Sequence, residues 1–219
     1  MSVQIIKKAV KHINIKVRPT GEVILTAPLQ TEDAHIDFIL AKRADWIAQK
    51  LDFYKMNQPA QAKEYVSGEN IRYLGRNYRL KVIQSDEESV KLQRAYLHLF
   101  VKDKSDLERK KKLVKAWYKS RAKIHFHKAL LKYQPLVKKE VATVTIREMK
   151  TRWGSCHPSK AYINLNSSLI CKLTECIEYV VLHELAHLEH PNHSKQFYNY
   201  MSLHMPDWKR RKMKLERRD

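Results

Sequence analysis

Apolar and polar side chains alternate over the first part of the chain, a pattern that is typical of β-strands. Residues 13–17 alternate in this way, residues 19–22 (Pro-Thr-Gly-Glu) supply turn chemistry, and residues 23–25 resume the apolar run. This order predicts a hairpin. Residues 33–54 then carry apolar side chains at helical spacing, which predicts one helix.

Two further strand-like stretches follow this predicted helix. They cover residues 73–82 and 90–101, and the polar run 86–89 forms a turn between them. The composition then changes at residues 102–106, where we expect a domain boundary.

A long helix is predicted over residues 107–131, and Pro135 ends or kinks it. Its apolar side chains fall near one stripe: Leu107, Val114, Trp117, Ile124 and Leu131. Its other faces are basic and carry Arg109, Lys110, Lys111, Lys112, Lys115, Lys119, Arg121 and Lys123.

The remaining pattern predicts two short strands and a buried helix. The strands cover residues 141–147 and 162–166, with a loop at 151–156 between them. Residues 177–188 are apolar nearly all round, which is typical of a helix buried on every side. That helix nevertheless contains His183, Glu184 and His187, and burying ionisable groups is costly unless something pairs with them.

The charge of the chain is its one extreme property. The 219 residues include 43 Lys and Arg against 23 Asp and Glu, a net charge of +20. Such an excess attracts polyanions but assigns no chemistry. The basic run 209–218 predicts an amphipathic helix. Because this run and the basic faces of the 107–131 helix lie far along the sequence from His183, we expect them to recruit an anionic partner, a nucleotide or nucleic acid, and not to serve catalysis.

Cysteine content and apolar run length bear on location. Three cysteines give no disulfide framework and agree with a reducing compartment. Charged side chains interrupt every apolar run well short of the roughly 20 residues that a membrane-spanning helix needs, so we expect no membrane insertion. The first residues lack the apolar block of a signal peptide, which favours a cytoplasmic protein.

His183, Glu184 and His187 form the motif H-E-x-x-H. Histidines four residues apart on a helix lie on the same face and can share one zinc ion, while the glutamate between them is placed to act as general base on a metal-activated water. A third ligand must come from elsewhere. His193 is the preferred candidate, because Pro191 breaks the helix and lets the chain bend back. Asp207 is the second choice, and His190 is a weaker candidate because it lies one turn further along the helix and points past the shared metal.

At this point several segments together resemble a known family. They are Arg152–Cys156, Ile163–Asn166, Tyr179–Leu188 and His193–Phe197, preceded by Ser67–Glu69 and Tyr73–Arg76. Their order is similar to that of the YgjP-like metallopeptidase family, which has kinship to SprT-like and other minimal zincins. The resemblance covers nearly the whole chain. It implies a metal-dependent hydrolase with zinc ligands His183, His187 and His193 and with Glu184 as the general base.

Together, the pattern and the resemblance predict an α+β fold. We expect a β-rich N-terminal region with one helix at residues 1–104. We expect a minimal zincin-like hydrolase domain at 105–219, built from an active-site helix, a backing helix and a small sheet.

Further residues are candidates for substrate contacts. In zincins an edge strand pairs with an extended substrate, and residues 161–166 are the predicted edge strand. Arg152, Tyr162 and Tyr198 could each stabilise an oxyanion. The cysteines have no C-x-x-C spacing, so we interpret them as buried thiols: Cys156, Cys171 and Cys176.

The leading functional hypothesis is a zinc metallopeptidase that acts on a peptide or protein. One alternative is a zinc-dependent hydrolase of a nucleotide or other phosphoanhydride. Another is a nucleic-acid-associated protein whose zinc site is not catalytic. Against the last, a structural zinc site usually fills all four positions with Cys and His, whereas three histidines leave one position open.

Overall fold

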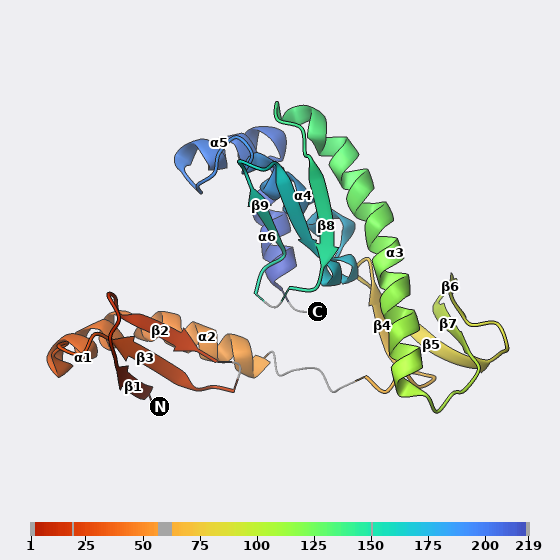
Figure 1. The fold of residues 1–219 in the computed structure, drawn as a ribbon, viewed down its shortest axis with the longest axis horizontal. Coiled ribbons are helices and arrows are strands. Elements are labelled where there is room, and N and C mark those ends of the chain that lie inside the picture. Colours follow the sequence, from red (N-terminus) through yellow and green to blue (C-terminus); the bar gives the residue numbers. More distant parts are fainter. Residues whose placement is uncertain (1–2, 19, 57–62, 150, 218–219) are drawn as a thin grey trace. The chain divides into compact units, whose positions relative to one another are not determined.

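The computed structural model describes residues 3–18, 20–56, 63–149 and 151–217 (Figure 1). Their helices and small mixed sheets confirm the predicted α+β class. The chain divides into two compact units, residues 1–63 and 64–219. Within the described ranges, no helix has both the length and the apolar character needed to cross a membrane.

The first unit contains a three-stranded sheet with the order β1-β3-β2. Its strands are β1 (Val3–Lys7), β2 (Asn14–Val17) and β3 (Val23–Ala27). The antiparallel pairing of β2 with β3 confirms the predicted hairpin, although Pro19 of its turn lies outside the described residues. Strand β1 pairs in parallel with β3 and was not predicted.

Two helices replace the single helix expected at residues 33–54. They are α1 (Asp33–Lys42) and α2 (Ala44–Met56), with a break at Arg43. Ile36 of α1 packs with Leu25 and Ala27, whereas Ile47 of α2 packs in a separate cluster. The prediction of one helix was wrong because each helix buries its apolar residue against a different part of the sheet, and the chain bends between them.

The second unit begins with a four-stranded sheet of order β4-β5-β7-β6. Its strands are β4 (Asn70–Tyr73), β5 (Arg76–Gln84), β6 (Ser89–Gln93) and β7 (Tyr96–Val101). The predicted stretch 90–101 is therefore two strands. Leu74 and Gly75 connect β4 to β5 and both have positive φ, as a two-residue hairpin loop of type I′ requires.

The first sheet of this unit shares one core with α3 (Leu107–Tyr133). Leu97 and Leu99 of β7 are completely buried in the same cluster as Val114 and Trp117 of α3. The structure therefore divides the chain between residues 63 and 64, and the boundary predicted between 104 and 105 falls inside the second unit. Residues 102–106 form the loop between β7 and α3. Because strands β4–β7 share one core with α3, this change in composition does not mark a domain boundary.

The predicted apolar stripe of α3 is only partly buried. Val114 and Trp117 are buried, but Leu107, Ile124 and Leu131 are 41%, 57% and 64% exposed. The side chains that α3 buries are Lys110, Val114, Trp117, Ala122, Phe126, Ala129 and Tyr133. This helix contacts the β4–β7 sheet near its start and α4 further along, so no single straight stripe describes its buried side chains. The buried Lys110 donates its Nζ hydrogen to the carbonyl of Glu64.

The rest of the second unit surrounds α4 (Thr174–Ala186). A second mixed sheet has the order β8-β10-β9. The remaining elements are β8 (Thr143–Arg147), β9 (Gly154–His157), β10 (Tyr162–Asn166), the 3-10 helices η1 (Gln134–Leu136) and η2 (Ser167–Cys171), α5 (Lys195–His204) and α6 (Trp208–Glu216). α3, α5, α6, β9 and β10 all contact α4 (Figure 1), which explains why its sequence is apolar nearly all round.

The expectation that residues 161–166 form an edge strand was wrong. β10 lies in the middle of its sheet, parallel to β8 on one side and antiparallel to β9 on the other. The free edge next to α4 belongs to β9, which the sequence presented as a loop. A single glycine and small polar side chains gave β9 no recognisable alternation.

Candidate metal centre

Two of the candidate ligands come from the end of α4. His183 lies in its last turn and His187 is the residue that caps it. Their ring centroids are 4.8 Å apart. The Nδ1 atom of His187 is 3.1 Å from the carbonyl oxygen of His190. A ring that donates from Nδ1 to a carbonyl keeps Nε2 as an acceptor, which is the arrangement commonly found behind metal-binding histidines.

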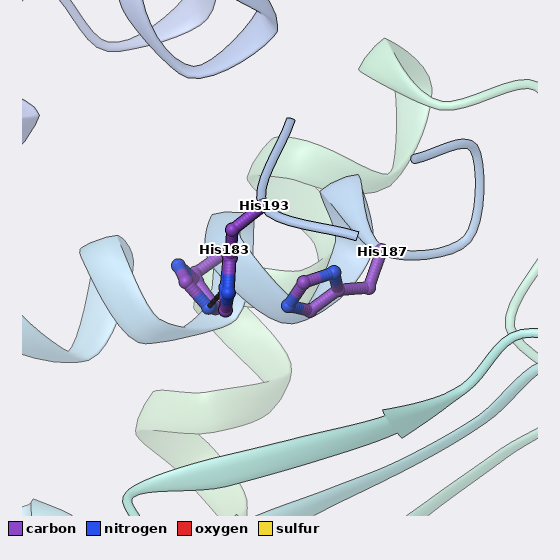
Figure 2. A group of neighbouring side chains, drawn as sticks. All are labelled: His183, His187 and His193. Atoms are coloured by element: carbon purple, nitrogen blue, oxygen red, sulfur yellow. Dashed lines mark hydrogen bonds between the residues drawn. The ribbon is translucent and has the colours of Figure 1, made fainter. Parts of the chain in front are cut away.

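His193 reaches the same place from the loop between α4 and α5 (Figure 2). Its Nε2 atom is 3.1 Å from Nε2 of His183. One nitrogen from each of His183, His187 and His193 lies within 4.8 Å of the other two. Ser194 then begins α5, because its hydroxyl accepts the backbone N–H of Phe197 and caps the helix.

The structure places the two alternative ligands elsewhere. The ring of His190 packs against Tyr200 with centroids 5.3 Å apart, and this residue faces the cluster only through its carbonyl. Asp207 accepts hydrogen bonds from Arg210 and Arg211 at the start of α6. Neither side chain belongs to the converging group of His183, His187 and His193. Among the described residues, no cysteine joins that group.

The ring of Phe197 contacts all three imidazoles. It is 1% exposed, and its ring centroid lies 5.0 Å from His183, 4.7 Å from His187 and 4.9 Å from His193. A rigid aromatic ring in contact with each imidazole restricts their rotation. Phe197 was part of the motif used for the resemblance, but its role as a platform was not visible in the sequence.

The electrostatic surroundings keep two of these rings neutral. Burial, together with repulsion from His187 and His193, lowers the pKa of His183 to about 3. Burial also lowers the pKa of His187, although the hydrogen bond to the His190 carbonyl opposes it. A metal binds the lone pair of a neutral imidazole, so neutral rings at neutral pH suit metal binding. Convergence, support and neutrality make this donor set fit a divalent metal.

Glu184 is buried beside the histidines, with 5% of its surface exposed. A β-carbon added at Gly154 of β9 would lie 2.5 Å from Oε1 of Glu184, so only glycine allows this approach. Burial raises the pKa of the Glu184 carboxyl to about 8, and the charge of Arg152 acts in the opposite direction. The carboxyl thus lies between the cluster of three histidines and the free edge of a strand.

A pocket of about 240 Å³ opens at this point. Its walls include Arg152, His183, Glu184 and Lys212. Lys212 comes from the basic C-terminal run, and its charge contributes to the lowered pKa of His183. Although this run is distant from His183 along the sequence, the two are close in space because α6 packs directly on α4.

Most of the other bases of α6 form ion pairs within the protein. Arg211 pairs with Glu178 at 2.7 Å and with Asp207 at 2.9 Å, and Lys214 pairs with Glu175 at 2.7 Å. Trp208 and Leu215 are buried beneath them. The run therefore acts largely as a structural helix; its last predicted residue, Arg218, lies outside the described residues.

The three candidate oxyanion residues have different positions. Arg152 lines the pocket, and the Tyr198 ring stacks on His193 with centroids 6.2 Å apart. Tyr162 is not brought to the cluster. Its neighbour Ile163 is buried in the core that contains α4, so strand alternation places Tyr162 on the opposite face, where its hydroxyl bonds Thr145 Oγ1 at 2.7 Å.

Asn166 holds the loop before β9, a role that the sequence pattern did not indicate. Its side-chain amide donates to the carbonyls of Met149 and Arg152, and its Oδ1 accepts from the backbone and the hydroxyl of Ser168. Asn166 is 4% exposed. A buried asparagine at the end of an apolar strand is the sequence signal for such a clamp, because buried polar groups need partners.

Comparisons with solved structures and with known protein families each found a match. Among solved structures, the chain is similar to the crystal structure of the metallopeptidase zymogen jannalysin from Methanocaldococcus jannaschii, with 20% identity and a TM-score of 0.35. That match covers 42% of this chain and 91% of the other. No curated protein sequence matches the chain. The YgjP-like metallopeptidase domain matches residues 11–218, nearly the full length, so the chain belongs to the YgjP-like family of metal-dependent peptidases.

Proposed function

We propose that this protein is a zinc-dependent peptidase in which His183, His187 and His193 hold the metal and Glu184 is the general base. The observation that carries the proposal is the convergence of three imidazole nitrogens within 4.8 Å of one another beside a buried carboxyl. Zinc suits this donor set, since catalytic zinc sites use three protein ligands and leave one position open. When bound, zinc would polarise the scissile carbonyl and lower the pKa of water.

Glu184 would move the proton during hydrolysis. The oxygen of water forms a bond to the carbonyl carbon, and Glu184 accepts the proton that the water loses. Glu184 then delivers that proton to the amide nitrogen as the carbon–nitrogen bond breaks. Its burial beside the histidine cluster places this carboxyl where it can exchange a proton with the reacting groups.

β9 would hold the substrate in an extended conformation. It is an edge strand, so one row of its N–H and C=O groups has no partner strand within the sheet. A peptide added along this edge would pass Gly154, where an added β-carbon would lie only 2.5 Å from Oε1 of Glu184. Arg152 and Tyr198 lie near enough to the cluster to be tested as oxyanion stabilisers.

The test is Glu184→Gln, which keeps the shape of the side chain and removes its basicity. We expect the variant to retain the zinc content of the wild type and to lose peptide hydrolysis by a factor of at least about 10³. Metal analysis and turnover of a mixed peptide library measure the two effects. Unchanged hydrolysis, or hydrolysis of nucleoside triphosphates but of no peptide, would contradict the proposal.

Two further variants test whether His193 or its neighbour His190 is the third zinc ligand. His193→Ala removes one of three ligands, so zinc affinity should fall by about 100-fold or more. His190→Ala keeps the backbone carbonyl that faces His187 and should leave zinc affinity within about threefold of the wild type. Competition with a chromogenic chelator measures both, and the reverse order would reject His193 as the third ligand.

A further inference from the structure

The sheet β4-β5-β7-β6 presents a row of aromatic side chains on the face opposite its core. Leu97, Leu99 and Val101 of β7 are completely buried on the core face. Strand alternation therefore places Tyr96, His98 and Phe100 together on the other face. Their ring centroids follow one another at 6.1 and 6.3 Å, and His98 and Phe100 stack with an interplanar angle of 29°.

Basic side chains from both neighbouring strands flank this row. Lys81 of β5 and Lys91 of β6 each pair with His98 in the strand register, which puts them on the same face. The Lys81 ammonium lies 4.1 Å from the Tyr96 ring centroid, and that of Lys91 lies 5.6 Å from the centroid of Phe100. Arg79 pairs with Tyr96 and is exposed. The four strands contain no Asp or Glu, so this positive charge is not balanced within the sheet.

We propose that this outer face binds single-stranded nucleic acid. Aromatic side chains on a sheet stack with unpaired bases regardless of their identity, and cations beside them contact the phosphates. An acidic polypeptide would complement the lysines, but it has no bases to stack on the three rings, of which Tyr96 is the most exposed. This site lies on a sheet other than the one that borders the histidine cluster, so the inference does not depend on peptidase activity.

The experiment measures the affinity of the full chain for fluorescent oligonucleotides of about 12 nucleotides, a length within the usual range for such platforms. Oligo(dT) or oligo(U) should bind more tightly than a duplex of the same length. Tyr96→Leu should weaken single-strand binding roughly tenfold with little change in the salt dependence. Lys81→Ala with Lys91→Ala should weaken it and also flatten the dependence of affinity on salt.

The matched control is Lys112→Ala with Lys119→Ala. These lysines are exposed on α3, which packs against the core face of the same sheet, and the double variant has the same net charge as the test variant. If the outer face of the sheet binds the nucleic acid, the affinity of this control should stay within about twofold of the wild type. If the basic faces of α3 recruit the nucleic acid, as the sequence alone suggested, the control should lose as much affinity as the test variant. An equal loss in the control would overturn the proposal, as would a duplex that binds as tightly as the single strand, or displacement by polyglutamate at equal charge. Thermal unfolding establishes that each variant remains folded, and the lysine pair tests the proposal even if the Tyr96 variant unfolds.

Discussion

The two small sheets of the second unit differ in the part of the sheet that is free. Sheet β8-β10-β9 buries polar side chains, Asn164 and Asn166, and its free edge β9 approaches Glu184. Sheet β4-β5-β7-β6 is covered by α3 on one face, and its other face is aromatic and basic. Both are short mixed sheets, so strand composition alone does not separate them. What packs against each sheet decides whether an edge or a face remains available for a ligand.

Among the substitutions that compare the two sheets, the largest effect is expected at the edge strand β9. Gly154→Ala places a methyl group 2.5 Å from Oε1 of Glu184 and must displace one of them. A displacement of about 1 Å at a catalytic group can cost 100-fold in rate, so peptide hydrolysis should fall at least that much. His157→Ala, at the exposed other end of β9, should keep wild-type hydrolysis. Activity of Gly154→Ala within about threefold of the wild type would show that the contact is not tight.

In the sheet β4-β5-β7-β6, replacing a glycine should lower the free energy of unfolding and leave the rate of peptide hydrolysis unchanged. Gly75 has φ of +77°, and a β-carbon there would lie 2.4 Å from a methyl group of Leu173. Gly75→Ala should lower the free energy of unfolding by about 2–4 kcal/mol while the folded fraction keeps its hydrolysis rate. Gly68→Ala, at φ of +99° but with no atom within 4 Å, isolates the backbone cost and should lose only about 1 kcal/mol. Urea unfolding measures both variants. If Gly75→Ala and Gly68→Ala lose the same unfolding free energy, the Leu173 side chain moves aside at little cost.

A smaller difference in unfolding free energy is expected between a buried polar side chain of the sheet β8-β10-β9 and an exposed one of the sheet β4-β5-β7-β6. Asn166→Ala leaves the carbonyls of Met149 and Arg152 without their donor and should cost about 2 kcal/mol in urea unfolding. Asn77→Ala, on the exposed part of β5, should cost less than about 0.5 kcal/mol. A loss below about 0.5 kcal/mol for Asn166→Ala would remove its role as a clamp of the loop before β9.

The smallest effect concerns the contact between the helices that cover the two sheets. Glu178 of α4 accepts hydrogen bonds from Lys132 of α3 and from Arg211 of α6 at 2.8 and 2.7 Å. Burial raises the pKa of Glu178, but these hydrogen bonds outweigh it and the pKa is lowered from 4.5. A lowered folded-state pKa stabilises the protein fully above the unfolded value, and this contribution is lost as the pH falls through the folded-state pKa.

Glu178→Gln should therefore cost about 1–2 kcal/mol of unfolding free energy at pH 7, and the difference from the wild type should shrink below pH 4.5. Urea unfolding at several pH values measures this difference. Exposed Glu140→Gln is the control and should change stability little at either pH. A difference that stays constant with pH would mean that the charge of Glu178 does not stabilise the contact.

Much of the second unit could be predicted because local sequence specifies it. The type and position of the helices around 107–131 and 177–188 followed from apolar periodicity, and Pro191 indicated that the chain turns before His193. The errors share a physical cause. The helix break at Arg43, the buried stripe of α3 and the domain boundary all depend on which distant surfaces each element covers, and neighbouring residues do not encode that.

The same division applies to the candidate site. The sequence by itself determined that His183 and His187 share a helix face with Glu184 between them, because four-residue spacing fixes their relation. Only the tertiary structure decided that His193 completes the group, that Phe197 supports it and that β9 is the free edge beside it. It also moved Tyr162 to the far face of β10 and brought Lys212 into the pocket. A helix sets distances within about one turn, whereas contacts between separate elements depend on how whole surfaces pack.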